Sequence, residues 1–342
     1  MQTAWRGMKL VVAVIGVVVA NVAAQAPSPP AGVTEREITV PGPVPLPGTL
    51  TLPAGKGLVP VVVLVHGSGA GDRDLTIGAG ADQVKPYRDI AWGLAARGVA
   101  VLRYDKRAKV KPFWYFGRPF TVKDETIDDA VAALQLARQQ PELDSTRSFF
   151  IGHSLGGMLA PRIALADGHV AGVIIMAGAT REKLQDAMPR QIEYMISLGG
   201  ADTSALRTQL AQYQPFLNAI RRVTPADSAK TQNLLGAPAS YYLDMNAYDP
   251  AAVMHQVTGP VLVLQGMRDY QVTPAGLDDW LKAVGPRREM TVKRYAALNH
   301  LFIAGEGPPN PSEYAKGGHV SEEMIGDVAK WIKDRKGVKP RG

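Results

Sequence analysis

The sequence contains no cysteine. Disulfide bridges, thiol chemistry and a lipid attached through a cysteine are therefore excluded. Aromatic residues are also few, at 7%, whereas hydrophobic residues make up 46% and charged residues 20% of the 342 positions. This is the composition of an ordinary globular protein that can bury a sizeable core, and its stability has to come from packing alone.

No apolar run near the start is long enough for a typical transmembrane helix. The run Leu10–Ala23 follows a basic leader with Arg6 and Lys9 and precedes the small residues Ala23–Ala26. This arrangement is typical of a secretory signal peptide. We predict a signal peptide over residues 1–24 that is cleaved, with retention as an N-terminal anchor as the alternative.

The segment that follows, residues 25–34, is rich in proline and is predicted to be a disordered spacer. A cleaved signal peptide implies an exported protein, either periplasmic or secreted, without stable membrane insertion. A single domain is then expected over residues 35–335, followed by a basic tail over residues 336–342.

The folded part carries no strong excess of one charge. The formal net charge is +7, but much of the excess lies at Arg6 and Lys9 and in the C-terminal segment KDRKGVKPRG. The remainder is close to neutral, so no basic face for nucleic acid is expected. The tail is predicted to be solvated, with binding of an anionic partner as the alternative.

Six short segments are mostly apolar and β-branched, as in strands buried on both faces of a parallel sheet. They are Val59–Gly67, Gly98–Asp105, Arg147–Ser154, Val170–Gly178, Pro260–Gly266 and Glu289–Tyr295. Helical segments separate most of them. Before them, REITVPGPV and GTLTLPAG alternate weakly and predict an antiparallel pair at a sheet edge. The fold class is therefore α/β, with a mostly parallel central sheet flanked by helices.

One interval interrupts this alternation. Residues of about 180–257 contain no convincing strand and show only helical periodicity. We predict an inserted helical cap, because the chain leaves the sheet at this point and returns to it afterwards.

Ser154 lies in the segment IGHSLGG, between a predicted buried strand and a predicted helix. A G-x-S-x-G sequence in that context is typical of a nucleophile elbow, where the serine is held in a strained turn. Only small residues fit two positions to either side, which explains Gly152 and Gly156. The alternative is that Ser154 only caps the following helix, but a cap does not account for the paired glycines.

A serine nucleophile requires a base and an acid that orients the base. Asp269 follows the strand PVLVLQG and His300 follows the strand EMTVKRY, so both are predicted at the carboxyl edge of the sheet. The order Ser154, Asp269, His300 is the one expected for this architecture. The other histidines have structural interpretations: His66, His153, His169, His255 and His319.

The oxyanion of an acyl-transfer intermediate needs two donors. The backbone N–H of Leu155, directly after the nucleophile, is one candidate. The other is the backbone N–H of Ser68, in the glycine-rich loop HGSGAGDRD after the first core strand. This chemistry needs no metal and no organic cofactor.

The chain resembles the serine hydrolases of the alpha/beta-hydrolase fold, most closely bacterial carboxylesterases. The matching segments are VVVLVHGSGAGDRD, GVAVLRYDKR, IGHSLGG, LQGMRDYQV and LNHLF. The resemblance implies the same roles for Ser154, Asp269 and His300. It also implies mainly structural roles, in buried ion pairs near the oxyanion loop, for Asp72, Arg73, Asp74, Asp105 and Arg107.

This chain departs from many relatives at Leu155, where they have Glu, and at DKRAKVK, where they have a glycine-rich DKRGxGxS. The second departure leads into the aromatic segment Pro112–Phe120, which either packs beside the cap or lines the substrate pocket. We expect hydrolysis of a small-molecule ester. The alternatives are a peptidase or amidase, a thioesterase or acyltransferase, and a non-catalytic binding protein.

Overall fold

The fold is described for residues 28–199 and 203–338 of a computed structural model. Its centre is one eight-stranded sheet with the strand order β1-β2-β4-β3-β5-β6-β7-β8. The strands are β1 (Thr34–Val40), β2 (Leu46–Leu52), β3 (Val59–Val65), β4 (Ala100–Tyr104), β5 (Leu143–His153), β6 (Gly172–Met176), β7 (Val261–Gly266) and β8 (Met290–Tyr295). The six predicted core strands and the edge pair are all present.

Strand direction follows the sequence pattern. From β4 to β8 every neighbouring pair is parallel. At the other edge, β1 pairs antiparallel with β2, and β2 pairs antiparallel with β4. The predicted α/β class with a mostly parallel sheet is confirmed.

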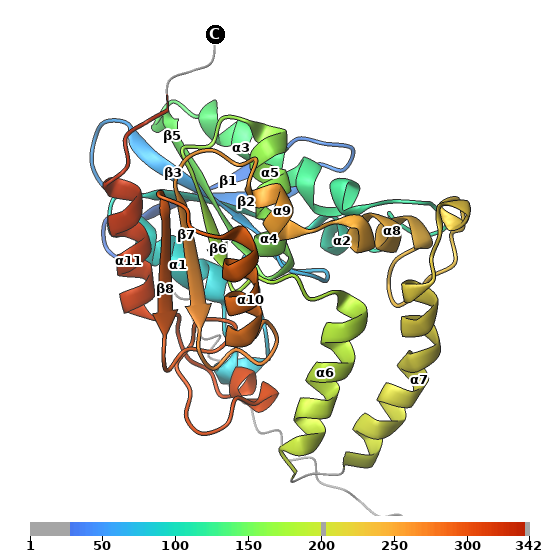
Figure 1. Cartoon of the computed structure of the whole chain (residues 1–342). Coiled ribbons are helices and arrows are strands. Elements are labelled where there is room, and N and C mark those ends of the chain that lie inside the picture. The colour runs from blue at the N-terminus through green and yellow to red at the C-terminus, as the bar shows by residue number, and fades with distance from the viewer. Residues whose placement is uncertain (1–27, 200–202, 339–342) are drawn as a thin grey trace, which may run out of the picture.

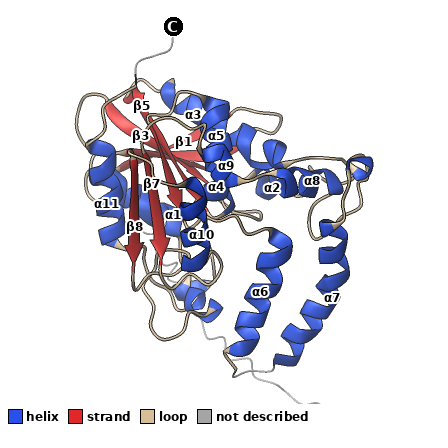
Figure 2. Cartoon of the chain, in the orientation of Figure 1, coloured by secondary structure: helices blue, strands red, loops and turns tan. Residues whose placement is uncertain are grey.

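Helices cover both faces of the sheet, and further helices form an insertion away from it (Figure 2). They are α1 (Pro86–Ala95), α2 (Arg107–Val110), α3 (Asp128–Arg138), α4 (Leu155–Met158), α5 (Ala160–Asp167), α6 (Leu184–Ser197), α7 (Thr203–Arg221), α8 (Ala239–Ala247), α9 (Pro250–Met254), α10 (Pro274–Val284) and α11 (Glu322–Lys333). Alternate residues of β3 show how the core divides. Val61 and Val63 pack in a cluster with α3, α5 and α10, whereas Val62 and Leu64 pack with α1 and α11.

Both faces of the central strands are therefore covered by helices. This explains why their sequences are continuous apolar runs and not alternating ones.

The interval between β6 and β7 contains α6, α7, α8 and α9 and no strand among its described residues. Figure 1 shows α6 and α7 side by side, away from the sheet, with α8 returning towards it. A small cluster around Ile220 and Tyr242 joins α7 and α8 to Phe120 of the preceding aromatic segment. This helical insertion is called the cap below.

Both predicted ends lie partly outside the described residues. The predicted signal peptide falls entirely within residues 1–27, outside the described part. The predicted spacer is too long, because Val33 is buried and Thr34 already begins β1. The predicted tail also begins too early, since the N–H of Val338 donates to the carbonyl of Thr146 at 2.9 Å.

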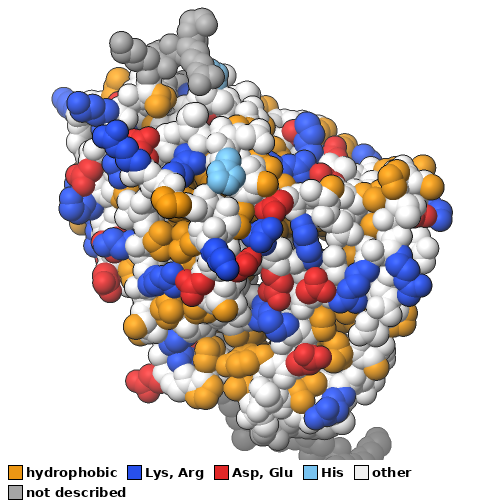
Figure 3. Space-filling model, viewed as in Figure 1, with side chains coloured by type: hydrophobic (Ala, Val, Ile, Leu, Met, Phe, Trp, Pro, Cys, Tyr) orange, Lys and Arg blue, Asp and Glu red, His pale blue; other side chains and the backbone are white. Residues whose placement is uncertain are grey.

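Charged side chains of both signs intermingle on the face of the molecule shown in Figure 3. No helix within residues 28–199 and 203–338 combines the length and apolar character that crossing a bilayer requires.

Candidate active site

Ser154 occupies the sharp turn between the end of β5 and the start of α4. Its backbone has φ 54° and ψ −118°, a conformation that costs a non-glycine residue on the order of 1–3 kcal/mol. Its N–H donates to the carbonyl of Met176 at 2.9 Å, which ties the turn to β6. The side chain makes no capping hydrogen bond to α4, so the interpretation of Ser154 as a plain helix cap is wrong.

Gly152 and Gly156 permit the close backbone packing at this turn. A Cβ placed on Gly152 would lie 2.3 Å from the carbonyl oxygen of Gly156. A Cβ on Gly156 would lie 2.5 Å from the carbonyl oxygen of His66. Backbone cannot move aside as a flexible side chain does, so both positions require glycine, as the sequence predicts.

Asp269 and His300 form a buried pair. The Oδ2 atom of Asp269 lies 2.7 Å from Nδ1 of His300, and the two residues are only 2% and 4% exposed. The other carboxylate oxygen, Oδ1, accepts the backbone N–H groups of Gln271 and Val272 at 2.8 and 2.9 Å. The loops after β7 and β8 thus meet at the carboxyl edge of the sheet, and every oxygen of the carboxylate is occupied.

His153 connects the elbow to this pair. Its ring centroid lies 4.8 Å from that of His300, and its Nε2 lies 3.0 Å from the carbonyl oxygen of His300. Because a carbonyl only accepts, Nε2 carries the proton, and Nδ1 then accepts from the hydroxyl of Tyr87 at 3.1 Å. Residue 300 is therefore held next to the elbow by the residue that precedes Ser154.

Within the described part of the chain, Ser154 Oγ and the ring of His300 make no hydrogen bond with each other, and Nε2 of His300 has no partner. Such contacts often tighten only when substrate is bound. The nitrogen that a base needs is therefore unengaged.

The remaining histidines have other surroundings. His66 is buried and its Nε2 donates to the carbonyl of Tyr104 at 2.6 Å. His319 is exposed and lies 3.1 Å from Asp89. His169 and His255 are exposed as well. None of the six histidines is among the residues that line the cavity at Ser154 described below, and these four also lack the contact with the elbow that His300 has through His153.

Ser68 and Leu155 both lie on the wall of the same cavity as Ser154. Among the described residues, neither backbone N–H donates to a backbone or side-chain acceptor. Gly67, between the strand end and Ser68, packs closely on the elbow, since a Cβ there would lie 3.0 Å from Cβ of Ser154. Two unpaired amide donors therefore flank the serine.

The charged residues near this loop hold its backbone. Arg73 pairs with Asp105 at 3.2 Å, and Arg103 pairs with Asp74 at 2.9 Å. Asp72 accepts the backbone N–H groups of Asp74 and Thr76.

Farther along the chain, Arg107 and Asp129 form a buried ion pair. Burial raises the pKa of Asp129 and the arginine opposes that shift.

The cavity above Ser154 has a volume of about 320 Å³. Its wall combines the elbow and the loop after β7 with residues of α6 and α8 from the cap. The cap contributes apolar side chains, Leu184, Ala187, Met188, Tyr241, Tyr242 and Met245, and the amides Gln185, Gln191 and Asn246. Asp269 lies directly behind this wall, because Gln271 and Val272 line the cavity and also bind its carboxylate.

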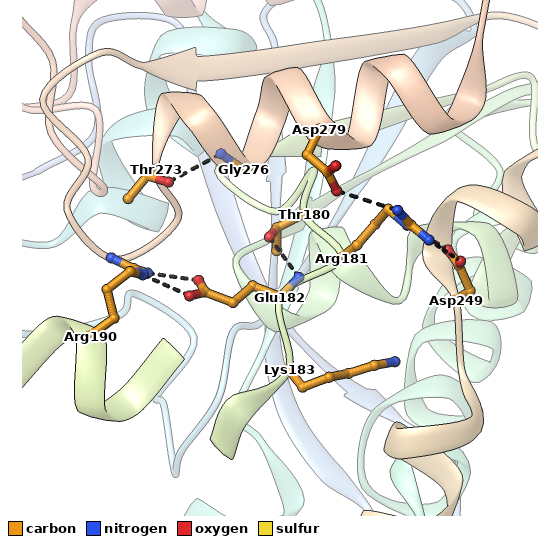
Figure 4. Close-up of a pocket in the computed structure, with 9 residues that line it drawn as sticks. All are labelled: Thr180, Arg181, Glu182, Lys183, Arg190, Asp249, Thr273, Gly276 and Asp279. Carbon is orange, nitrogen blue, oxygen red and sulfur yellow. Dashed lines mark hydrogen bonds and ion pairs between the residues drawn. The ribbon is translucent and has the colours of Figure 1, made fainter. Parts of the chain in front are cut away.

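A second cavity, of about 470 Å³, adjoins the first and shares Thr180, Glu182 and Lys183 with it (Figure 4). Most of its charges are paired with one another, whereas Lys183 donates to the carbonyls of Met245 and Tyr248. Arg181 contacts Asp249 and Asp279, and Glu182 contacts Arg190.

The lining of this second cavity contains neither a histidine nor an acid–base pair beside a nucleophile. Its lining residues come from the segment after β6, from α6, from Asp249 before α9 and from the start of α10. The cavity therefore lies where the cap joins the sheet.

The aromatic segment Pro112–Phe120 does not line the cavity at Ser154. Trp114 packs on the main core, and Phe120 packs on Tyr241 with ring centroids 5.6 Å apart. Phe113 and Phe116 are exposed. The segment therefore contacts the cavity at Ser154 indirectly, through Tyr241 and Tyr242 of α8.

No group of three or more His, Asp or Glu side chains within residues 28–199 and 203–338 is arranged to hold a metal ion.

Buried neutral histidines predict a loss of stability in acid. Burial lowers the pKa of His66 from 6.5 to about 4 and that of His153 from 6.5 to about 3. Between pH 6.5 and those values the unfolded chain binds protons that the folded chain does not. The stabilisation is therefore complete above pH 6.5 and falls as the pH decreases, by about 1.4 kcal/mol per pH unit for each group.

Urea unfolding at pH 4.5 to 6.5 measures this slope. His153→Asn should reduce it by about 1.4 kcal/mol per pH unit, whereas the control His255→Asn, at an exposed position, should leave it unchanged. A slope that is the same in His153→Asn and in the unaltered protein would contradict the prediction.

Comparison with known proteins agrees with the fold. Residues 62–324 match the alpha/beta hydrolase family. The esterase EstD of Thermotoga maritima is 39% identical over 306 residues, which cover 89% of this chain and 68% of EstD. An esterase of Pyrococcus furiosus has a similar structure, with a TM-score of 0.54 at 16% identity, over 89% of this chain and 91% of its own.

The crystal structure of 2,6-dihydroxy-pseudo-oxynicotine hydrolase is similar too, with a TM-score of 0.53 at 18% identity, over 90% of this chain and 70% of its own. At sequence identities of 16% and 18%, the similarity to these two structures supports the fold alone. The family match and the similarity to EstD each extend over most of the sequence. The chain therefore belongs to the alpha/beta hydrolase family.

Proposed function

We propose that this protein hydrolyses carboxylic esters through an acyl-enzyme on Ser154. The observation that carries the proposal is the strained serine at the start of α4 with the buried His300–Asp269 pair beside it. The similarity to the esterase EstD supports the choice of an ester as substrate.

In the proposed reaction, Ser154 Oγ attacks the ester carbonyl carbon while Nε2 of His300 takes the hydroxyl proton. Asp269 holds the ring by its Nδ1–H and stabilises the positive charge that develops on it. The carbon–oxygen bond to the alcohol then breaks, and His300 returns the proton to the leaving oxygen. Water attacks the acyl-serine with His300 again as base, which releases the carboxylic acid and restores the serine.

The N–H groups of Ser68 and Leu155 are the proposed donors to the oxyanion. Each such donor contributes on the order of 10²–10³ in rate. The dipole of α4 adds little to this, because α4 spans only Leu155–Met158. In the proposed site, the two backbone N–H groups and the turn that carries them therefore provide the electrostatic stabilisation of the oxyanion.

The proposed substrate is a small ester with an apolar acyl group. The volume of about 320 Å³ and the apolar side chains of α6 and α8 favour such a group over a charged one. The two charged residues of the lining are engaged elsewhere, Glu182 by Arg190 and Lys183 by the carbonyls of Met245 and Tyr248. Amides, peptides and thioesters remain alternative substrates, and they are outcomes of the assays below.

Replacing the nucleophile tests the reaction. Ser154→Ala should lower kcat/KM for p-nitrophenyl esters by a factor on the order of 10⁴ or more, since it removes the atom that forms the acyl-enzyme. A fluorophosphonate should add its mass to the unaltered protein and to the control Ser145→Ala, but not to Ser154→Ala. Absence of labelling on all three proteins would overturn the proposal, and faster turnover of peptide p-nitroanilides would replace the ester with an amide.

The cap residue Met188 is expected to limit acyl length, because it lies on the cavity wall. Met188→Ala should raise kcat/KM for long-chain relative to short-chain p-nitrophenyl esters by about 10-fold, as expected for added space of a few methylenes in an apolar pocket. The control Phe113→Ala alters an exposed residue away from the cavity and should leave the ratio unchanged. If the ratio of kcat/KM between long-chain and short-chain esters is the same in the unaltered protein, Met188→Ala and Phe113→Ala, then Met188 does not set the selectivity for acyl length.

We also propose that the protein is exported to the periplasm or secreted. The support is the sequence of residues 1–24, with a basic leader, an apolar run and small residues at the cleavage position. Expression in a Gram-negative host followed by fractionation and N-terminal sequencing should yield a protein outside the cytoplasm that begins at Gln25. Recovery of a membrane-bound protein that still begins at Met1 would favour the anchor instead.

A further inference from the structure

Lys106 is buried immediately behind the oxyanion loop. It follows β4, precedes α2, and is only 3% exposed. Its Nζ donates to the carbonyl oxygen of Gly67 at 3.0 Å and forms an ion pair with Glu125. It does not line the cavity at Ser154, so it is not placed to touch a substrate there.

Burying the charged ammonium group of a lysine costs free energy, so the buried position of Lys106 calls for an explanation. Moving an ammonium group out of water costs several kcal/mol, and an apolar pair of the same shape is often at least as stable. Here the charge is matched by Glu125, whose other carboxylate oxygen accepts the hydroxyl of Thr126 at 2.6 Å. The second partner of Lys106 is the Gly67 carbonyl, and that contact connects the ion pair to the candidate active site.

Because the peptide bond is planar, the contact with the Gly67 carbonyl also affects the direction of the Ser68 N–H. The carbonyl of Gly67 and the N–H of Ser68 belong to one peptide group, and the described chain has no cis peptide bond. In a trans peptide group the C=O and the N–H point in opposite directions. When Lys106 holds the carbonyl on the buried side, the Ser68 N–H points away from Lys106, on the side of the cavity that Ser68 lines.

The surrounding contacts leave this peptide group little freedom to rotate. The backbone N–H of Lys106 donates to the carbonyl of Gly71 at 3.0 Å, and the N–H of Arg73 donates to Asp105 at 2.7 Å. Together with the bond from His66 to the Tyr104 carbonyl, these contacts fix the loop from both ends to the end of β4. The Lys106 side chain holds the peptide group itself, because its Nζ donates to the Gly67 carbonyl.

We propose that Lys106, paired with Glu125, is a positioning residue that orients the Ser68 N–H toward the oxyanion. The inference rests on the proposed function of Ser154 and deepens it. A merely structural ion pair would affect folding alone. A positioning residue affects the transition state, because a donor has to be aimed at the place where charge develops.

The test compares Lys106→Met with the double variant Lys106→Met/Glu125→Gln, which leaves no unpaired buried carboxylate. The expected result in both is a decrease of about 10- to 100-fold in kcat for a p-nitrophenyl ester, with KM changed by less than about threefold. The affinity for an alkyl boronic acid, whose tetrahedral adduct mimics the oxyanion, should fall by a similar factor.

Two controls separate this role from a loss of folded protein. Lys109→Met, in α2 three residues later and exposed, should leave kcat and boronic acid affinity unchanged. Lys106→Arg retains a cation that can donate to the carbonyl and should recover part of kcat. The final extent of fluorophosphonate labelling gives the fraction of competent sites, and all rates are divided by it.

The two proposals fail in different ways. If the unaltered protein is not labelled by the fluorophosphonate, the proposed function itself is overturned. If it is labelled and turns over esters, but the corrected kcat and boronic acid affinity of the double variant equal those of the unaltered protein, the role of Lys106 alone is overturned.

Discussion

The close approach of backbone to backbone where β5 turns into α4 is the constraint on which the rest of the site depends. Gly152 and Gly156 have no Cβ, and the space that a Cβ would take is filled by carbonyl groups of the neighbouring turn and strand. The chain can reverse this tightly only if Ser154 adopts a positive φ. That conformation keeps the hydroxyl from capping the helix and leaves it on the cavity wall.

The partners of the serine are held from the buried side. Burial keeps His153 neutral, so its ring can donate to the His300 carbonyl and accept from Tyr87 at the same time. Burial also raises the pKa of Tyr87, so its hydroxyl keeps the proton that it donates. An uncharged network of this kind suits a site beside an oxyanion, because it orients His300 without adding a fixed charge.

Much of the fold could be predicted because its signals are local. Continuous apolar runs indicate strands covered on both faces, and the elbow glycines lie within two residues of Ser154. Asp269 and His300 follow from the rule that parallel strands present their carboxyl ends at one edge. The pairing at 2.7 Å between their side chains agrees with that interpretation.

The roles of Tyr87, His153 and Lys106 could not be predicted, because each depends on contacts between distant parts of the chain. Lys106 lies in GVAVLRYDKR, a segment that matches relatives, but its partners are 19 and 39 residues away. The cap residues that line the cavity could not be predicted either. The segment of α8 that lines the cavity has a weak amphipathic pattern, so the sequence does not reveal which side faces Ser154.

The cap and the catalytic loop share one set of contacts, which has a consequence for selectivity. Arg190 of α6 pairs with Glu182 and also donates to the carbonyls of Tyr270 and Gln271 at 2.8 and 2.7 Å. The N–H of Gln271 in turn binds the carboxylate of Asp269. The helix α6, which lines the cavity at Ser154, is thus fastened to the loop that carries Asp269. Substitutions that move α6 are therefore expected to change both the pocket and the alignment of Asp269, whereas substitutions of cap side chains on the cavity wall, such as Met188, are expected to alter the pocket alone.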